Sequence, residues 1–177
     1  MSFLLDTNVV SEWTRPRPNA GVVEWLAEVD EDEVFLSVVT FAELRHGIER
    51  LAAGARRRRL DEWLRNVLPL RFEGRIAGVD GAIADEWGRL VARCEARGRP
   101  IHAMDALIAA TAQVHGLTLV TRNTGDFQAS VKSLLNPWTS PRTHLADARR
   151  GESCGRLSDN RRGGNSRPND MCWDNFG

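Results

Sequence analysis

The chain has 177 residues, of which 42% are hydrophobic and 27% charged, and its 24 Lys and Arg residues balance its 24 Asp and Glu residues. This length suits one domain with a real hydrophobic core, and a zero net charge argues against a protein that coats nucleic acid by bulk charge. The three cysteines are scattered, so we expect no disulfide framework and no zinc site. The sequence has no long apolar run and no basic leader, so we expect no membrane span and no signal peptide. Together these features predict a cytoplasmic protein.

Short apolar segments alternate with helical patterns along the first 138 residues. In chain order the patterns predict a strand at 3–5 that turns into a helix, a helix at 19–29, a strand at 34–38, helices at 40–53 and 56–68, a strand at 76–79, helices at 81–97 and 103–115, a strand at 117–121 and a weak last strand at 131–135. The strands are continuous apolar runs, which is typical of a parallel sheet covered by helices on both faces. The predicted fold class is therefore α/β, and ligands of such folds bind beyond the carboxyl ends of the strands.

The composition changes near Trp138. Residues 139–177 contain only three Leu, Ile, Val or Phe residues and are dominated by Gly, Ser, Asn, Asp and Arg. Such a segment buries too little apolar surface to offset its ordering entropy, so we expect a folded domain at 1–138 and a disordered tail at 139–177. Without the seven Arg and five acidic residues of the tail, the domain has 17 basic and 19 acidic residues.

Four acidic residues lie at predicted junctions between strands and helices. Asp6 follows the first strand, Glu43 and Asp105 each lie in the first turn of a helix, and Asp126 follows the 117–121 strand. In a parallel α/β fold these junctions share one edge of the sheet, so we expect the four carboxylates to converge in one cleft.

Each acid also has a purely structural explanation. Asp6 suits the cap of a helix, Glu43 forms a capping box with Thr40, Asp105 suits a helix dipole, and Asp126 suits the cap of a turn. Taken singly, these explanations are about as good as a catalytic role, and for Glu43 better. Taken together, they leave unexplained why all four acids fall on the same edge, and why Asp105 precedes nine uncharged helical residues.

A divalent cation would explain the four acids together. Two carboxylates about 4 Å apart repel by about 4 kcal/mol at an effective dielectric near 20, enough to protonate one of them at neutral pH. A cation removes this conflict, and ligands that are all oxygen favour Mg²⁺ or Mn²⁺ over Zn²⁺. Carboxylate-bound Mg²⁺ usually serves a phosphate substrate, often as a pair of ions that activates water and stabilises the leaving oxygen. The sequence supports neither a Ser or Cys nucleophile with a His–acid pair nor a Gly-rich phosphate loop.

Four segments together resemble the PIN-domain ribonucleases, and most closely the FitB-like branch of the VapC toxins of toxin–antitoxin modules. The segments are Leu4-Leu5-Asp6-Thr7-Asn8-Val9-Val10-Ser11-Glu12, Thr40-Phe41-Ala42-Glu43-Leu44, Asp105-Ala106-Leu107-Ile108-Ala109-Ala110 and Thr121-Arg122-Asn123-Thr124-Gly125-Asp126-Phe127. Asn136-Pro137-Trp138 matches the usual end of such chains, so the resemblance covers residues 1–138. Two features depart from the family pattern: the 128–135 segment lacks a glycine expected before the last strand, and the tail is foreign to the family.

The resemblance implies a PIN-like three-layer fold and a Mg²⁺- or Mn²⁺-dependent endoribonuclease that is the toxin of its module. Such toxins are usually homodimers that are neutralised by a small VapB- or FitA-like antitoxin, and they meet DNA only through that antitoxin. The family pattern makes metal-binding catalytic acids of Asp6, Glu43, Asp105 and Asp126. It makes hydrogen-bonding neighbours of Asn8, Thr40, Thr121 and Asn123.

In the mechanism that follows from this assignment, Asp6 and Asp105 hold the primary metal, while Glu43 and Asp126 complete the site or bind a second ion. Activated water then attacks the phosphodiester in line and leaves 5′-phosphate and 3′-hydroxyl ends. Two alternatives remain open. One is a DNA or flap nuclease of the same fold, because no sequence feature shows recognition of the 2′-hydroxyl. The other is a non-catalytic interaction module in which the acids are kept as helix caps.

Overall fold

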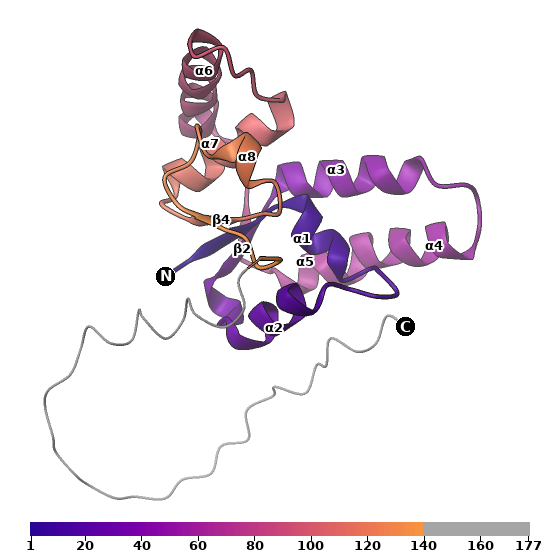
Figure 1. Ribbon diagram of the computed structural model, residues 1–177. Coiled ribbons are helices and arrows are strands. Elements are labelled where there is room, and N and C mark those ends of the chain that lie inside the picture. The colour runs from indigo at the N-terminus through magenta and orange to yellow at the C-terminus, as the bar shows by residue number, and fades with distance from the viewer. Residues whose placement is uncertain (140–177) are drawn as a thin grey trace, which may run out of the picture.

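Five short parallel strands form the central sheet of the structure, a computed structural model that describes residues 1–139 (Figure 1). The strands are β1 (Phe3–Leu5), β2 (Val34–Ser37), β3 (Ile76–Ala77), β4 (Thr118–Val120) and β5 (Leu134–Leu135). Their order is β3-β2-β1-β4-β5, and every pair is parallel, which confirms the predicted parallel sheet. The predicted tail lies outside the described residues from residue 140 onward.

Helices connect the strands and cover both faces of the sheet. They are α1 (Thr7–Glu12), α2 (Ala20–Glu28), a 3₁₀ turn (Glu31–Glu33), α3 (Val38–Glu49), α4 (Ala55–Glu62), a π-helical segment (Trp63–Val67), α5 (Leu68–Arg71), α6 (Gly81–Ala96), α7 (Ala103–Val114) and α8 (Thr124–Phe127). The predicted three-layer α/β architecture is therefore confirmed.

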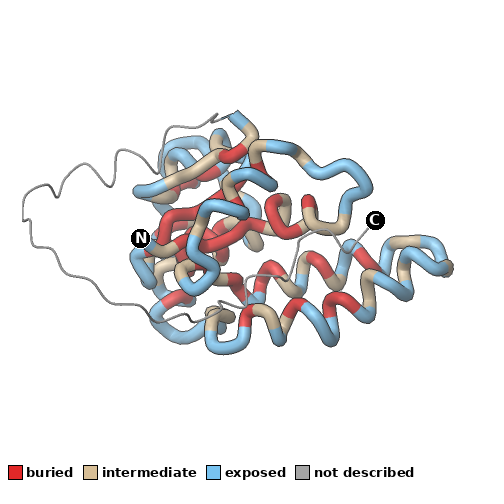
Figure 2. Tube along the Cα trace, turned by 90° about the horizontal axis from the view of Figure 1, so that it is seen from below, coloured by how far each residue is buried: buried red, intermediate tan, exposed pale blue. Residues whose placement is uncertain are grey.

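The alternation of β1 side chains divides the core into two hydrophobic clusters. Phe3 and Leu5 contribute to a cluster on the face covered by α1, α2 and α5, whereas Leu4 points into a cluster made with α6 and α7. Figure 2 shows the buried positions along the strands and on the inner sides of the helices. Because β1 is buried on both faces, each of its side chains stabilises the fold by about 1.5–3 kcal/mol.

Four predicted elements differ from the structure in their extent. The helix predicted at 40–53 is shifted toward the N-terminus, since α3 spans Val38–Glu49. The helix predicted at 56–68 is divided, because its regular part ends at Glu62 and a π-helical segment precedes α5. The physical reason is Pro69, whose ring would clash with the carbonyl of Arg65 in a regular α-helix. The strands predicted at 76–79 and 131–135 form only two-residue pairings, at the two edges of the sheet.

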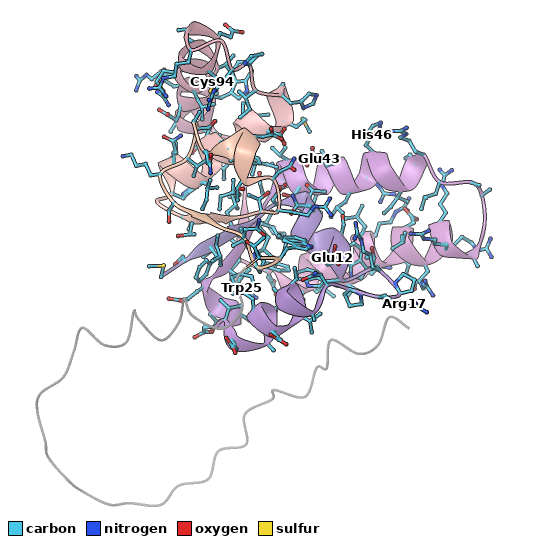
Figure 3. All side chains as sticks on the ribbon, in the orientation of Figure 1. Glu12, Arg17, Trp25, Glu43, His46 and Cys94 are labelled. Atoms are coloured by element: carbon cyan, nitrogen blue, oxygen red, sulfur yellow. The ribbon has the colours of Figure 1, made fainter. Side chains whose placement is uncertain are left out.

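A buried glutamate fastens α1 to the start of α2. Glu12 is 1% exposed and lies in the interior in Figure 3. Its Oε1 is 2.8 Å from Nη1 of Arg15, and its Oε2 accepts a hydrogen bond of 2.9 Å from the backbone N–H of Asn19. Asn19 in turn caps α2 by accepting from the backbone N–H groups of Gly21 and Val22. The Glu12 side chain therefore sets the path of the 13–19 connection.

Replacing Glu12 by Ala should lower the free energy of unfolding by about 2 kcal/mol, because it leaves a cavity and a partly buried N–H without an acceptor. Glu12→Gln keeps an acceptor for Asn19 and should lose about half as much. Urea unfolding at pH 7 measures both effects, with Glu24→Ala on the exposed side of α2 as the matched control. Equal stability of the Glu12→Ala and Glu24→Ala proteins would contradict the role given to Glu12.

Candidate active site

Asp6 lies where β1 ends and α1 begins, and it is 6% exposed. Its backbone N–H donates to the carbonyl of Val120 at 3.0 Å, which continues the β1–β4 pairing by one residue. Its Oδ1 accepts from the backbone N–H of Thr7 at 2.6 Å. Its Oδ2 accepts from Thr121 Oγ1 at 2.6 Å and from Asn8 Nδ2 at 2.5 Å. Three hydrogen bonds therefore fix this carboxylate, and it also caps α1, as its structural explanation required.

Burial raises the pKa of Asp6 from 3.8 to about 6. The hydrogen bonds from Thr121 and Thr7 oppose this shift, because they stabilise the charged form. The charges of Glu43 and Asp105 add to it, so these two carboxylates lie within electrostatic reach of Asp6. The buried environment therefore strains the ionised form of this side chain unless a cation compensates it.

Glu43 lies in the second turn of α3, not in the first turn as the sequence indicated. The helix begins at Val38, because Ser37 Oγ accepts from the backbone N–H of Val39 at 3.2 Å and acts as the cap. The capping box of Thr40 with Glu43 is therefore wrong. Glu43 instead accepts a hydrogen bond from Thr7 Oγ1, which joins α3 to α1. Its place near the start of α3 is labelled in Figure 3.

Asp105 and Asp126 complete the group of acids. Asp105 lies half-buried in the first turn of α7, and its pKa is raised by burial first and then by the charge of Glu43. His102 opposes this shift of the Asp105 pKa, whereas Asp126 adds to it. Asp126 is exposed and lies inside the short helix α8 rather than at the cap of a simple turn, since Asn123 holds the cap position. The pKa values of Asp6 and Asp105 are thus raised in part by the charges of neighbouring acids of this group.

Three of the four predicted hydrogen-bonding neighbours form one network around Asp6. Asn8 Nδ2 donates to Thr121 Oγ1 at 3.0 Å as well as to Asp6. Thr121 Oγ1 also accepts from the backbone N–H of Asn123 at 3.0 Å. Asn123 Nδ2 donates to Asp126 Oδ2 at 3.0 Å, so the network reaches from β1 to α8.

The fourth predicted neighbour, Thr40, contacts backbone rather than an acid. Its Oγ1 donates to the carbonyl of Leu5 at 3.4 Å, one residue before Asp6. Sequence reasoning missed Thr7, whose hydroxyl contacts Glu43. The available signal was its position, because a hydroxyl residue at the first position of a helix after a buried strand stands at the same sheet edge as the acids.

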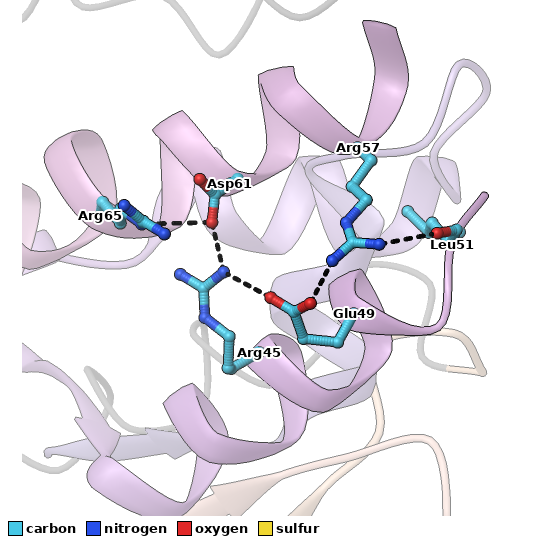
Figure 4. Close-up of polar contacts among 6 residues, drawn as sticks. All are labelled: Arg45, Glu49, Leu51, Arg57, Asp61 and Arg65. Carbon is cyan, nitrogen blue, oxygen red and sulfur yellow. Dashed lines mark hydrogen bonds and ion pairs between the residues drawn. The ribbon is translucent and has the colours of Figure 1, made fainter. Parts of the chain in front are cut away.

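An ion-pair network fixes the helix that carries Glu43 (Figure 4). Arg45 of α3 pairs with Asp61 of α4 and with Glu49, and Glu49 also pairs with Arg57 of α4. Arg65 Nε lies 3.2 Å from the same Asp61 carboxylate. Partly exposed pairs of this kind contribute little stability individually, but several sharing partners hold the two helices in register.

The residues of this group suit a hard divalent cation. None of the four acids forms an ion pair with a Lys, Arg or His residue within 1–139. The donors are carboxylate oxygens, and the buried one carries a raised pKa, which a cation would reverse. In the described part of the chain, no three His, Cys, Asp or Glu side chains converge closely enough to hold an ion as they stand.

No helix within residues 1–139 is long and apolar enough to cross a membrane.

Comparisons with known proteins bear on this arrangement. The family model described as PIN domain matches residues 3–132, a range that contains all four acids. Toxin FitB of Neisseria gonorrhoeae is 44% identical over 137 residues, which cover 77% of this chain and 98% of the relative. VapC ribonuclease Y4jK of Sinorhizobium fredii is 34% identical over 136 residues, covering 77% and 97%. A solved structure of FitAB bound to an IR36 DNA fragment has a TM-score of 0.74 at 39% identity and covers 80% of this chain and 99% of that one.

Proposed function

Because the chain belongs to the PIN-domain family, we propose that it is a metal-dependent endoribonuclease and the toxin of a toxin–antitoxin pair. The names of its relatives support this, since one is a toxin and another a VapC ribonuclease, and both align over 97% or more of their own length. RNA is the proposed substrate, and the proposed location is the cytoplasm.

The observation that carries the proposal is the state of Asp6. It is buried, it has a pKa of about 6, and it stands beside two further carboxylates without a basic partner in the described residues. A chain that kept its acids only as helix caps would not gain from burying Asp6 against the charges of Glu43 and Asp105. This argues against the non-catalytic interaction module.

The four acids would have different roles at the metal site, according to their surroundings. Asp6 and Asp105, the two with raised pKa values, would hold the primary Mg²⁺ or Mn²⁺, and Glu43 and Asp126 would complete the site. When bound, the metal supplies positive charge to the scissile phosphate and activates water for in-line attack. Asn8 and Thr121 keep the Asp6 carboxylate oriented through their hydrogen bonds to Oδ2. Thr7 orients Glu43 in the same way.

The proposed protein partners follow from the relatives. The FitAB structure contains a toxin with its partner on DNA, so we propose a small antitoxin that binds this chain and carries the complex to DNA. An antitoxin side chain that reaches the four acids would be basic, because an Arg pairs with two carboxylates at once and competes with the metal. A homodimer is the proposed assembly of the toxin itself.

Cleavage of matched substrates tests the function. The purified full chain is incubated with a single-stranded RNA and with a DNA of the same sequence, in Mg²⁺, in Mn²⁺ and in excess chelator. We expect cleavage of RNA only, dependent on the metal, with 5′-phosphate and 3′-hydroxyl ends. Equal cleavage of the DNA would identify a DNA nuclease of the same fold. Cleavage that persists in chelator, or none with either metal, would refute the proposal.

A further inference from the structure

Arg122 and Trp138 form a cation–π pair whose arginine directly follows Thr121, a partner of Asp6. Arg122 follows Thr121 in the connection from β4 to α8, and its guanidinium carbon lies 5.7 Å from the centroid of the Trp138 ring. The arginine is exposed, whereas the tryptophan is half-buried. A guanidinium over an indole face keeps its N–H edge available to a further ligand.

The tryptophan is held in place from several sides. Its ring packs against the hydrophobic cluster of β1 and α2, and its backbone N–H donates to Asn136 Oδ1 at 3.0 Å. Asn136 Nδ2 donates to the backbone carbonyl of Arg122 at 3.4 Å. The preceding Pro137 runs directly against α2, since a Cβ added at Gly21 would lie 2.3 Å from the Pro137 oxygen. The ring is thus a fixed support for the arginine rather than a free surface group.

The backbone of Arg122 belongs to the network around Asp6. Its N–H donates to Asn8 Oδ1 at 3.2 Å, and the neighbouring Thr121 hydroxyl donates to Asp6. Within residues 1–139 no carboxylate forms an ion pair with the Arg122 guanidinium. The backbone of Arg122 is therefore anchored at the edge of the acid group, while its guanidinium lies over Trp138 and stays available to a further anion.

We propose that Arg122, supported by Trp138, binds a backbone phosphate of the RNA next to the phosphate that is cleaved. This inference rests on the proposed ribonuclease function. Four carboxylates repel a polyanion, so a strand that approaches them needs a cation at the edge of the site in addition to any metal. An arginine makes paired, charge-assisted hydrogen bonds to phosphate oxygens, and such contacts set the register of the strand without reading its sequence.

Steady-state kinetics on an RNA that the parent protein cleaves tests the role of Arg122. Arg122→Ala should lower kcat/KM about tenfold to a hundredfold, mainly by raising KM, because it removes a hydrogen-bonding partner of a charged group from substrate binding. Arg122→Lys should recover part of the lost kcat/KM, because the lysine ammonium keeps the charge but not the paired hydrogen bonds. The matched control is Arg89→Ala, since Arg89 is also exposed but sits on α6 paired with Asp85.

The contribution of the tryptophan is tested by a double-mutant cycle. Trp138→Leu should lower kcat/KM only about threefold, and it should have almost no effect when Arg122 is already Ala, because the ring acts through the arginine. If Trp138→Leu lowered kcat/KM as much in the Arg122→Ala protein as in the parent, Trp138 would act on the fold rather than through the arginine.

Binding measured as a function of salt separates phosphate contact from a structural effect. In an Asp6→Asn background that does not cleave, Arg122→Ala should weaken RNA binding alike for different sequences and reduce the slope of log Kd against log salt by about 1. A purely structural arginine would leave that slope unchanged. If the parent cleaves RNA and Arg122→Ala behaves like Arg89→Ala, this inference fails while the function stands. If the parent cleaves no RNA, both fall.

Discussion

Asp6→Asn is expected to reduce metal-dependent RNA cleavage by at least about a thousandfold. The loss of one charged ligand from the metal, worth several kcal/mol in the transition state, corresponds to a factor of this size. The substitution keeps the shape of the side chain and an oxygen that accepts from the N–H of Thr7, so the fold should persist. Asp105→Asn should have an effect of the same order, because Asp105 also carries a raised pKa among the acids.

The measurement is the cleavage rate of the variants in saturating Mn²⁺, with circular dichroism as the check on folding. Asp85→Asn is the matched control, since Asp85 is an exposed acid of α6 that pairs only with Arg89 among residues 1–139. Asp6→Asn protein that keeps more than about a tenth of the parent rate would refute the proposed metal site. In living cells the same variant should no longer inhibit growth, whereas Asp85→Asn should.

The second large effect is a loss of stability as the pH rises, which we expect added metal to restore. The folded state raises the pKa of Asp6 from 3.8 to about 6, so it binds this proton more tightly than the unfolded chain does. The contribution of Asp6 to the free energy of unfolding therefore falls as the pH rises from about 4 to about 6, and it stays low above that. Two pKa units correspond to about 3 kcal/mol.

Urea unfolding of the parent and of Asp6→Asn, in chelator, measures this contribution as a difference. Between pH 4 and pH 7 the parent should lose about 3 kcal/mol relative to the variant, and at pH 7 the variant should be the more stable by about 1 kcal/mol or more. The comparison cancels groups with the opposite trend, such as Asp61, whose pKa is lowered by Arg45. With Mn²⁺ at pH 7 the parent should regain stability and the variant should not. Parallel curves under all conditions would show that Asp6 is not strained by its burial.

The sequence predicted what depends on local pattern. Continuous apolar strands indicated the parallel sheet, and the acids at their ends indicated the edge where Asp6, Asp105 and Asp126 lie. The predicted start of α3 was wrong because Ser37 and Thr40 both suit a helix cap. Strand pairing decides between these two caps, because Ser37 ends β2 opposite Ala77 of β3 and the chain turns directly into the helix there.

Some contacts between distant segments could not be predicted from the local sequence pattern. The hydrogen bond from Thr7 to Glu43 joins residues 36 positions apart, and the local sequence places Thr7 at the right sheet edge without identifying Glu43 as its partner. The support of Arg122 by Trp138 depends in the same way on the last described residues folding back over α2. The sequence therefore located the acids and most of their hydrogen-bonding neighbours, whereas the pairing of Thr7 with Glu43 required the packed fold.

The position of β1 between β2 and β4 has a consequence for how this protein comes into being during translation. The hydrogen bond from Thr121 to Asp6 joins residues 115 positions apart, and Asp126 lies still later in the chain. A nascent polypeptide thus exposes its first acid early but lacks the strand and the last acid that complete the group. With the proposed site, cleavage would become possible only when almost the whole domain has left the ribosome. A cell that makes a harmful nuclease therefore has, for each copy, the full time of its synthesis in which to place a neutralising partner nearby.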